Sequence, residues 1–163
     1  MFPFRLSMKF EHLVEINDFR IPLLFRLNRA QVWAGLMHRV EDARPFLPGL
    51  DECRILARSE GFVERLLRFG QTEMRDRVSF AEAEWVRFET VPSEHHGGGV
   101  LTISIEEPEP GCLFLRFRYE TLFASGHEAE DAAYGEFLRQ AYEAADIDTV
   151  QWIRSLAEAV ARH

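Results

Sequence analysis

One long amphipathic segment at the end of the chain limits the folds that are open to it. From residue 128 to residue 162, apolar side chains recur at three- and four-residue spacing, the pattern of a helix with one buried face. The predicted face consists of Tyr134, Phe137, Leu138, Ala141, Tyr142, Ala145, Ile153, Leu156 and Val160. Asp146 and Asp148 are expected to mark a bend. At 1.5 Å per residue an unbroken helix of this length would span about 50 Å, enough to cross a small domain.

The sequence before this segment reads as a series of strands. Residues 8–16 alternate apolar and polar side chains, the period of two that is typical of a half-buried strand. Six further strand-like runs follow between Asp51 and Thr121, separated by turn residues such as Gly70-Gln71. A sheet with one apolar face must be covered, and the terminal helix is the only element long enough to cover it. The predicted fold class is therefore α+β, a curved seven-stranded antiparallel sheet wrapped around a long C-terminal helix.

Short helices are expected between the first strand and the later ones. Asn28 can cap a helix whose apolar residues recur at helical spacing. Those residues are Val32, Trp33, Leu36, Met37 and Val40. Pro45 and Pro48 then end any second short helix. A chain of 163 residues is close to the usual size of one domain. We therefore expect a single domain over residues 8–163, with residues 1–7 as an N-terminal extension.

A two-residue hairpin turn at Gly70-Gln71 would set the register of the neighbouring strands. In this register opposite charges face each other on the outer surface, and apolar side chains face each other on the inner surface. A slip of one residue would turn every inward side chain outward, so the agreement of both faces supports the pairing. The predicted partners are Glu64 and Arg77, Arg68 and Glu73, Leu67 and Met74, Val63 and Val78, Val78 and Phe88, and Arg77 and Glu89.

The same register makes Arg65 and Asp76 direct neighbours on the inner, apolar face. A buried charged pair loses much hydration free energy unless it is well hydrogen-bonded or faces a wet cavity. Polar groups in an apolar pocket are also how small ligands are oriented. Two interpretations stay open: the pair orients a ligand, or it is structural, either as an ion pair or with Arg65 reaching outward along the strand.

Further side chains are candidates for the wall of a cavity between sheet and helix. His12 is turned inward by the alternation of its strand, and it is either a hydrogen-bonded core residue or an acid–base group. Tyr119 turns inward on the last strand, where packing is the simpler role. Tyr142 and Tyr134 lie on the helix face and fit either the cavity or the core. The ligand-binding candidates are thus His12, Arg65, Asp76, Phe88, Phe117, Tyr119 and Tyr142, and no catalytic residue is assigned.

Other residue groups do not form recognisable sites. His95 and His96 are adjacent, so on extended backbone they point to opposite sides, and no third ligand follows at metal-site spacing. The three glycines that follow lack the strand-then-helix context of a phosphate-binding loop. Cys53 and Cys112 are too few for a disulfide framework, and free thiols are expected. We therefore expect no metal and no cofactor.

Charge and hydropathy narrow the range of partners. The net charge of −8 and the lack of a basic stripe argue against a nucleic-acid partner. No stretch approaches the roughly 18 consecutive apolar residues of a membrane span, and residues 1–7 lack the features of a signal peptide. We expect a cytoplasmic protein whose partner is a small hydrophobic molecule. A homodimer through outward apolar residues such as Phe114 is an open alternative.

Several runs of the sequence resemble one family. They are residues 8–17 (MKFEHLVEIN), 101–111 (LTISIEEPEPG), 113–117 (LFLRF), 119–121 (YET) and 140–142 (QAY). Together with the order of the elements, they make the chain similar to the AtaL-like family of the START-like, or SRPBCC, superfamily, which has the helix-grip fold. The resemblance implies a cavity between sheet and helix, used in this superfamily by lipid and hormone binders, by polyketide aromatase/cyclases and by chaperone partners. It brings no established catalytic residues.

Two functions of different kinds follow as hypotheses. The first is a module that binds a small hydrophobic or aromatic molecule and orients its polar end through His12, Arg65, Asp76 and Tyr119. The second is an enzyme of the polyketide cyclase or dehydratase kind, in which His12 or Asp76 moves protons. A third alternative, an interaction domain, requires that Phe and Tyr side chains of the protein itself fill the cavity.

Overall fold

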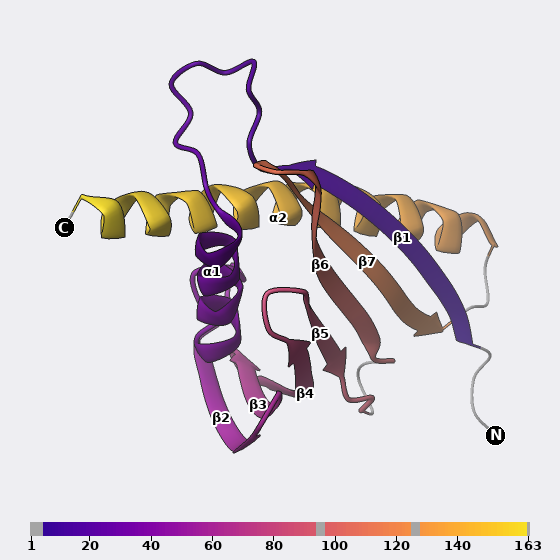
Figure 1. Cartoon of the computed structure of the whole chain (residues 1–163). Helices are drawn as coiled ribbons and strands as arrows, with labels where there is room; N and C mark the ends of the chain where they lie inside the picture. The colour runs from indigo at the N-terminus through magenta and orange to yellow at the C-terminus, as the bar shows by residue number, and fades with distance from the viewer. Residues whose placement is uncertain (1–4, 94–96, 125–127, 163) are drawn as a thin grey trace.

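The seven strands form one antiparallel sheet in which the first strand of the chain pairs with the last. The computed structural model describes residues 5–93, 97–124 and 128–162 (Figure 1). The strand order is β1-β7-β6-β5-β4-β3-β2, and every neighbouring pair is antiparallel. The predicted fold class is therefore confirmed. The elements are β1 (Arg5–Glu15), α1 (Arg29–Glu41), β2 (Glu52–Ser59), β3 (Phe62–Phe69), β4 (Thr72–Ala81), β5 (Trp85–Thr90), β6 (Gly99–Glu109), β7 (Cys112–Ala124) and α2 (Glu128–Ala161).

The long helix α2 lies across the sheet, and α1 packs against it (Figure 1). α2 is one helix of 34 residues and is straight in this view, so the predicted bend at Asp146 and Asp148 was wrong. Nearer its N-terminus, Tyr134 and Phe137 are 47% and 66% exposed. Only part of the predicted apolar face is therefore covered. The buried side chains that the structure describes on α2 all lie in its C-terminal half: Asp146, Thr149, Val150 and Ile153.

α1 begins at a capping box and approaches α2 closely. The Asn28 side chain accepts a hydrogen bond from the Gln31 backbone N–H at 2.8 Å, and the Gln31 side chain accepts one from the Asn28 N–H at 2.9 Å. Further along, Gly35 faces α2 so closely that a Cβ atom added there would lie 2.6 Å from Cγ2 of Ile153. The absence of a side chain at Gly35 therefore sets the distance between the two helices.

Two details differ from the predicted order. β1 begins at Arg5 and not at Met8, because β7 is long enough to pair with residues 5–7 as well. These three residues belong to the sheet, whereas we expected them in an extension, and residues 1–4 lie outside the described part of the chain. After α1 no second helix forms, and residues 44–49 make turns and a bend. The prolines in this stretch have no backbone N–H with which to continue a helix, so the predicted short helices are reduced to α1.

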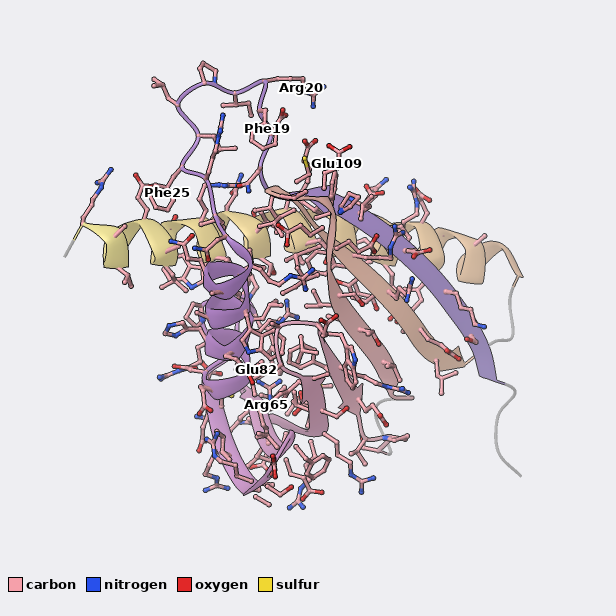
Figure 2. All side chains as sticks on the ribbon, viewed as in Figure 1. Phe19, Arg20, Phe25, Arg65, Glu82 and Glu109 are labelled. Carbon is pink, nitrogen blue, oxygen red and sulfur yellow. The ribbon has the colours of Figure 1, made fainter. Side chains whose placement is uncertain are left out.

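The predicted strand register is confirmed for every pair, which fixes the two faces of the sheet. On the outer face Glu64 and Arg77 form an ion pair at 3.5 Å, whereas Arg68 binds Glu52 of β2 at 3.1 Å. The inner face forms the core together with α1 and α2. Arg65, labelled in Figure 2, lies on this inner side beside the end of α1. Because this inner face is otherwise apolar, core packing alone does not explain the charged groups on it.

Candidate functional site

A cavity of about 230 Å³ lies on the inner face of the sheet. Strands β3 to β7 supply most of its wall, and Tyr142 closes it from α2. The wall is mainly apolar, and representative members are Leu67, Met74, Phe88 and Leu101. The side chains of the described residues therefore do not fill the space between sheet and helix, which argues against the alternative of a solid interaction domain.

A larger hollow of about 530 Å³ lies on the outer face of the sheet, but it is a weaker candidate. Many of its lining side chains are charged, including Glu11, Arg87 and Arg118. Glu11 already accepts hydrogen bonds from Arg116 and Arg118, both at 3.0 Å, and these contacts hold the pKa of Glu11 below its usual value. Charges that pair with each other across a wet surface offer little to a small apolar ligand.

Five of the seven predicted ligand-binding residues line the inner cavity: Arg65, Asp76, Phe88, Tyr119 and Tyr142. The other two do not. Phe117 is fully buried and belongs to the same core cluster as Val150 and Ile153 of α2. His12 points inward as predicted, but it contacts α2 and not the cavity. The structure thus brings most of the predicted residues together, and their role in binding stays a prediction.

Arg65 and Asp76 form a closed pair of charges in the wall of the cavity. Nε and Nη2 of Arg65 donate to the two carboxylate oxygens of Asp76 at 2.9 and 2.5 Å. Nη1 donates to the backbone carbonyls of Arg39 and Val40, in the last turn of α1, at 2.8 and 3.0 Å. Arg65 is 2% exposed and Asp76 is 4% exposed. The hydrogen bonds offset the loss of hydration, and they tie α1 to β3 and β4.

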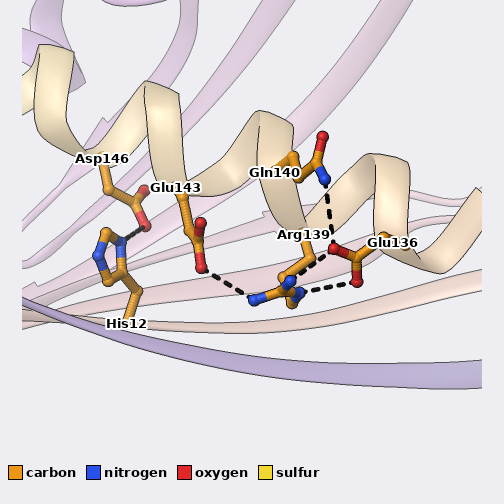
Figure 3. A network of polar contacts seen from close by, with 6 residues as sticks. All are labelled: His12, Glu136, Arg139, Gln140, Glu143 and Asp146. Carbon is orange, nitrogen blue, oxygen red and sulfur yellow. Dashed lines mark hydrogen bonds and ion pairs between the residues drawn. The ribbon is translucent and has the colours of Figure 1, made fainter.

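A second polar cluster joins α2 to β1 and β7, and its centre is Asp146. One carboxylate oxygen lies 3.1 Å from Nδ1 of His12 (Figure 3), and the other accepts a hydrogen bond from the hydroxyl of Tyr119. The Asp146 side chain is fully buried, whereas that of His12 is 23% exposed. Tyr119 also lines the cavity, so its hydroxyl connects the cavity wall to the buried carboxyl.

The electrostatics of this cluster keep a proton available near neutral pH. Burial raises the pKa of Asp146 from 3.8 to about 6, although the hydrogen bonds from Tyr119 and His12 act in the opposite direction. Burial and the nearby Asp146 charge raise the pKa of Tyr119, so its hydroxyl stays protonated and acts as a donor. The Asp146 carboxyl can therefore gain or lose a proton close to neutral pH.

The surface network in Figure 3 is separate from this cluster. Arg139 binds Glu136 at 2.5 Å and Glu143 at 3.2 Å, and all three side chains are substantially exposed. Pairs of this kind on a helix surface contribute little to stability. None of these three residues lines the cavity, so they are not part of the candidate site.

Aromatic rings form one end of the cavity. The rings of Tyr119 and Tyr142 are stacked with centroids 3.9 Å apart and planes 4° apart. Phe10 lies 6.1 Å and 6.3 Å from these two rings. The Tyr142 hydroxyl is 2.7 Å from Oγ1 of Thr121, and burial raises the pKa of Tyr142. The ligand would therefore meet flat π surfaces whose hydroxyls are already bound within the protein.

Sequence reasoning missed two charged residues of the site, Asp146 and Arg39. Asp146 lies four residues after Tyr142 and three before Thr149, so a carboxylate within a buried helical stripe was the signal. Arg39 lies three residues after the buried Leu36, in the same kind of position on α1. A charged residue at a core position of an amphipathic helix thus indicates a buried polar site, whereas we interpreted Asp146 as the mark of a bend.

The described residues contain no group of three or more metal-binding side chains, and their helices include none that is long and apolar enough to cross a membrane. The side chains around the cavity can bind a small molecule by apolar and aromatic contacts, and buried polar groups can orient it. The Asp146 carboxyl can take part in proton transfer.

Comparison with known proteins agrees with the family resemblance of the sequence. A family model described as AtaL, "Acetylaranotin biosynthesis cluster protein L", matches residues 16–159. No curated protein matches the chain.

Solved structures share the fold at low sequence identity. The Zhui aromatase/cyclase from Streptomyces sp. R1128 is 16% identical with a TM-score of 0.67, over 94% of each chain. The di-domain ARO/CYC StfQ from the steffimycin biosynthetic pathway is 11% identical with a TM-score of 0.66, over 97% of this chain and 53% of that one. SA2116 of Staphylococcus aureus, a protein of unknown function, is 11% identical with a TM-score of 0.64, over 99% and 98%. At these identities the similarity shows the fold alone.

Proposed function

The chain belongs to the AtaL family, and from this premise we propose that it binds a small hydrophobic, aromatic molecule in the cavity between the sheet and α2. The observation that carries the proposal is the mainly apolar cavity whose wall includes the stacked pair Tyr119 and Tyr142. Aromatic rings favour offset or stacked contact with other flat rings, and such pairs add about 0.5–1.5 kcal/mol to the burial of their surface.

The volume of the cavity limits the size of the ligand. Ligand pockets commonly measure roughly 300–1,000 Å³, and an apolar cavity of about 150 Å³ accommodates benzene. A cavity of about 230 Å³ therefore suits a molecule with one or two rings. The polar groups in the wall would set its orientation, because each is fixed by other protein groups before the ligand enters.

Fluorescence titration with 2-naphthol tests the proposal. Tyr142→Leu removes the ring that α2 contributes, so the affinity for 2-naphthol should fall about two- to ten-fold, the value of one aromatic contact. Tyr134→Leu is the matched control, because it removes a tyrosine from the exposed part of the same helix, and it should leave the affinity unchanged. Absence of saturable binding, or equal losses in both variants, contradicts the proposal.

A second candidate function is an enzyme of the cyclase or dehydratase kind. It is favoured by the pKa of about 6 of Asp146, because an acid–base group works best when its pKa is near the operating pH. Two of the similar structures are described as aromatase/cyclases, which is consistent with this function. Asp146 with His12 would move the proton. Asp76, the other carboxylate that the sequence suggested, is fully engaged by Arg65 and is the poorer base.

Turnover of a polyketide model substrate separates the two functions. An enzyme should lose at least about 100-fold in kcat when Asp146 is replaced by Asn, which is the lower limit for general acid–base catalysis. A binding module should show no turnover in either protein while 2-naphthol binding persists. The second function is abandoned if kcat is equal in the original protein and in Asp146→Asn.

A further inference from the structure

Arg39 is a buried cation whose donors are largely unused. It lies in the last turn of α1 and is 8% exposed. Among the described residues, its side chain makes one hydrogen bond, from Nη1 to Oγ1 of Thr149 at 3.1 Å, and no ion pair. A guanidinium carries five N–H donors. Arg65, which is also buried, donates to a carboxylate and to two backbone carbonyls. Fewer of its N–H donors are therefore left without a partner than in Arg39.

The guanidinium of Arg39 lies next to a residue of the cavity wall, although Arg39 itself is not a lining residue. Its Cζ atom lies 5.1 Å from the centroid of the Phe88 ring, and Phe88 is part of the cavity wall. Described polar atoms that are closed off from the surface all have partners, so the unpaired Nε and Nη2 atoms of Arg39 keep some accessible surface. The charged and titratable groups that act on it come from four elements: Tyr119 of β7, Arg65 of β3, Asp146 of α2 and Asp76 of β4.

Among the described residues, no carboxylate binds Arg39 directly. Asp76 is taken up by Arg65 through two short hydrogen bonds. Asp146 is bound to His12 and Tyr119. Burial lowers the pKa of Arg39, and the attraction of Tyr119, Asp146 and Asp76 opposes this change without cancelling it. A buried charge without a partner is costly, and a ligand that brings the opposite charge recovers that free energy on binding.

We propose that Arg39 is a ligand-binding residue that takes an anionic oxygen of the ligand, so that the molecule bound in the cavity is an aromatic carboxylate, phenolate or enolate and not a neutral hydrocarbon. The inference rests on the proposed binding function and deepens it by giving the chemical class of the ligand. The ring stacks at Tyr119 and Tyr142, and the oxyanion reaches the guanidinium past the edge of Phe88.

Two probes of equal shape and different charge test the inference. Calorimetric titration compares 2-naphthoate with 2-naphthamide. The protein should bind the carboxylate about ten-fold more tightly than the amide, equivalent to about 1.4 kcal/mol. Arg39→Met should abolish this preference and leave the affinity for the amide within about three-fold, because only a charge-assisted hydrogen bond is lost. Arg39→Lys keeps the charge and should keep most of the preference.

A substitute variant and a control variant complete the test of Arg39. Arg39→Gln also removes the charge and keeps a donor for Thr149, so it takes over if Arg39→Met does not fold. Arg87→Gln removes an arginine from the outer face and should leave the preference unchanged. Equal binding of both probes, or a preference that survives in Arg39→Met and Arg39→Gln, overturns the inference. Binding of 2-naphthol without preference for naphthoate overturns only the inference, whereas failure of all three probes overturns the proposed function as well.

Discussion

The guanidinium of Arg65 binds the carboxylate of Asp76 through two hydrogen bonds, at 2.9 and 2.5 Å, and holds the end of α1 with its remaining nitrogen. The two residues lie opposite each other on β3 and β4, as the charge pattern of the sequence predicts. Because every part of the pair is engaged, its first effect is to fix α1 on the sheet. The structural interpretation of the pair is therefore the stronger one, although both residues also line the cavity.

Replacing Arg65 by Met should destabilise the protein by about 3–5 kcal/mol, because Asp76 is then left buried without a partner. Urea unfolding at neutral pH measures the change. Arg68→Met, on the outer face of the same strand, should cost less than about 1 kcal/mol. The double variant Arg65→Met/Asp76→Leu should recover a large part of the loss, since it removes both charges. A single variant no worse than Arg68→Met would show that the pair is not coupled.

The stability of the protein should depend on pH through Asp146. Its pKa is about 6 in the folded protein against a usual value of 3.8, so folding favours the protonated form. This contribution is fully present below about pH 3.8 and is lost as the pH rises through about 6, with a total of at most about 3 kcal/mol. Asp146→Asn imitates the protonated carboxyl and should lack this dependence. Urea unfolding at a series of pH values, compared between the two proteins, would contradict the prediction if the two curves ran parallel.

The hydroxyl of Tyr119 should limit how far burial raises the pKa of Asp146. Tyr119→Phe removes a hydrogen bond that favours the charged carboxylate, so the pKa of Asp146 should rise above about 6. Carbon-13 NMR of the Asp146 carboxyl measures it directly. Tyr142→Phe is the control, because its hydroxyl binds Thr121 and not Asp146. A pKa of Asp146 that is the same in Tyr119→Phe as in the original protein would show that this hydrogen bond does not lower it.

A methyl group at residue 35 should separate the two helices. Gly35→Ala places a Cβ atom 2.6 Å from Cγ2 of Ile153, which is buried and cannot move aside. Overpacking of this kind costs about 1–3 kcal/mol, more than the helix-forming tendency of alanine returns. Thermal unfolding measures the loss. Adding Ile153→Ala removes both γ carbons that would clash, so the double variant should lose less stability than the sum of the two single variants. A stabilised Gly35→Ala variant would show that the contact is loose.

The sheet could be predicted because its signals are local and repeat. Each strand alternates with a period of two, and a turn at Gly70-Gln71 leaves only one register in which both faces agree. The ion pairs themselves were less predictable, since the long side chain of Arg68 turns to Glu52 on the neighbouring strand. Strand register depends on backbone parity, whereas an ion pair depends on which of several flexible side chains is nearest.

The candidate site was predictable only where strands form it. Asp146 meets His12, which lies 134 positions away in the sequence, and nothing in the helix pattern indicates that partner. Phe117 shares the inward parity of Tyr119, yet it is fully buried in the core. Parity tells which face a side chain occupies, but the position of a cavity on that face depends on the packing of α1 and α2.

The uneven packing of α2 has a kinetic consequence. Its buried residues run from Asp146 to Ile153, whereas Tyr134 and Phe137 closer to its start are exposed. Segments with few buried contacts open locally at a lower free energy than the whole protein unfolds. The first described turns of the helix should therefore fray more readily than the anchored turns, which hold the fold together. Local opening beside Tyr142 and global stability can then vary independently of each other.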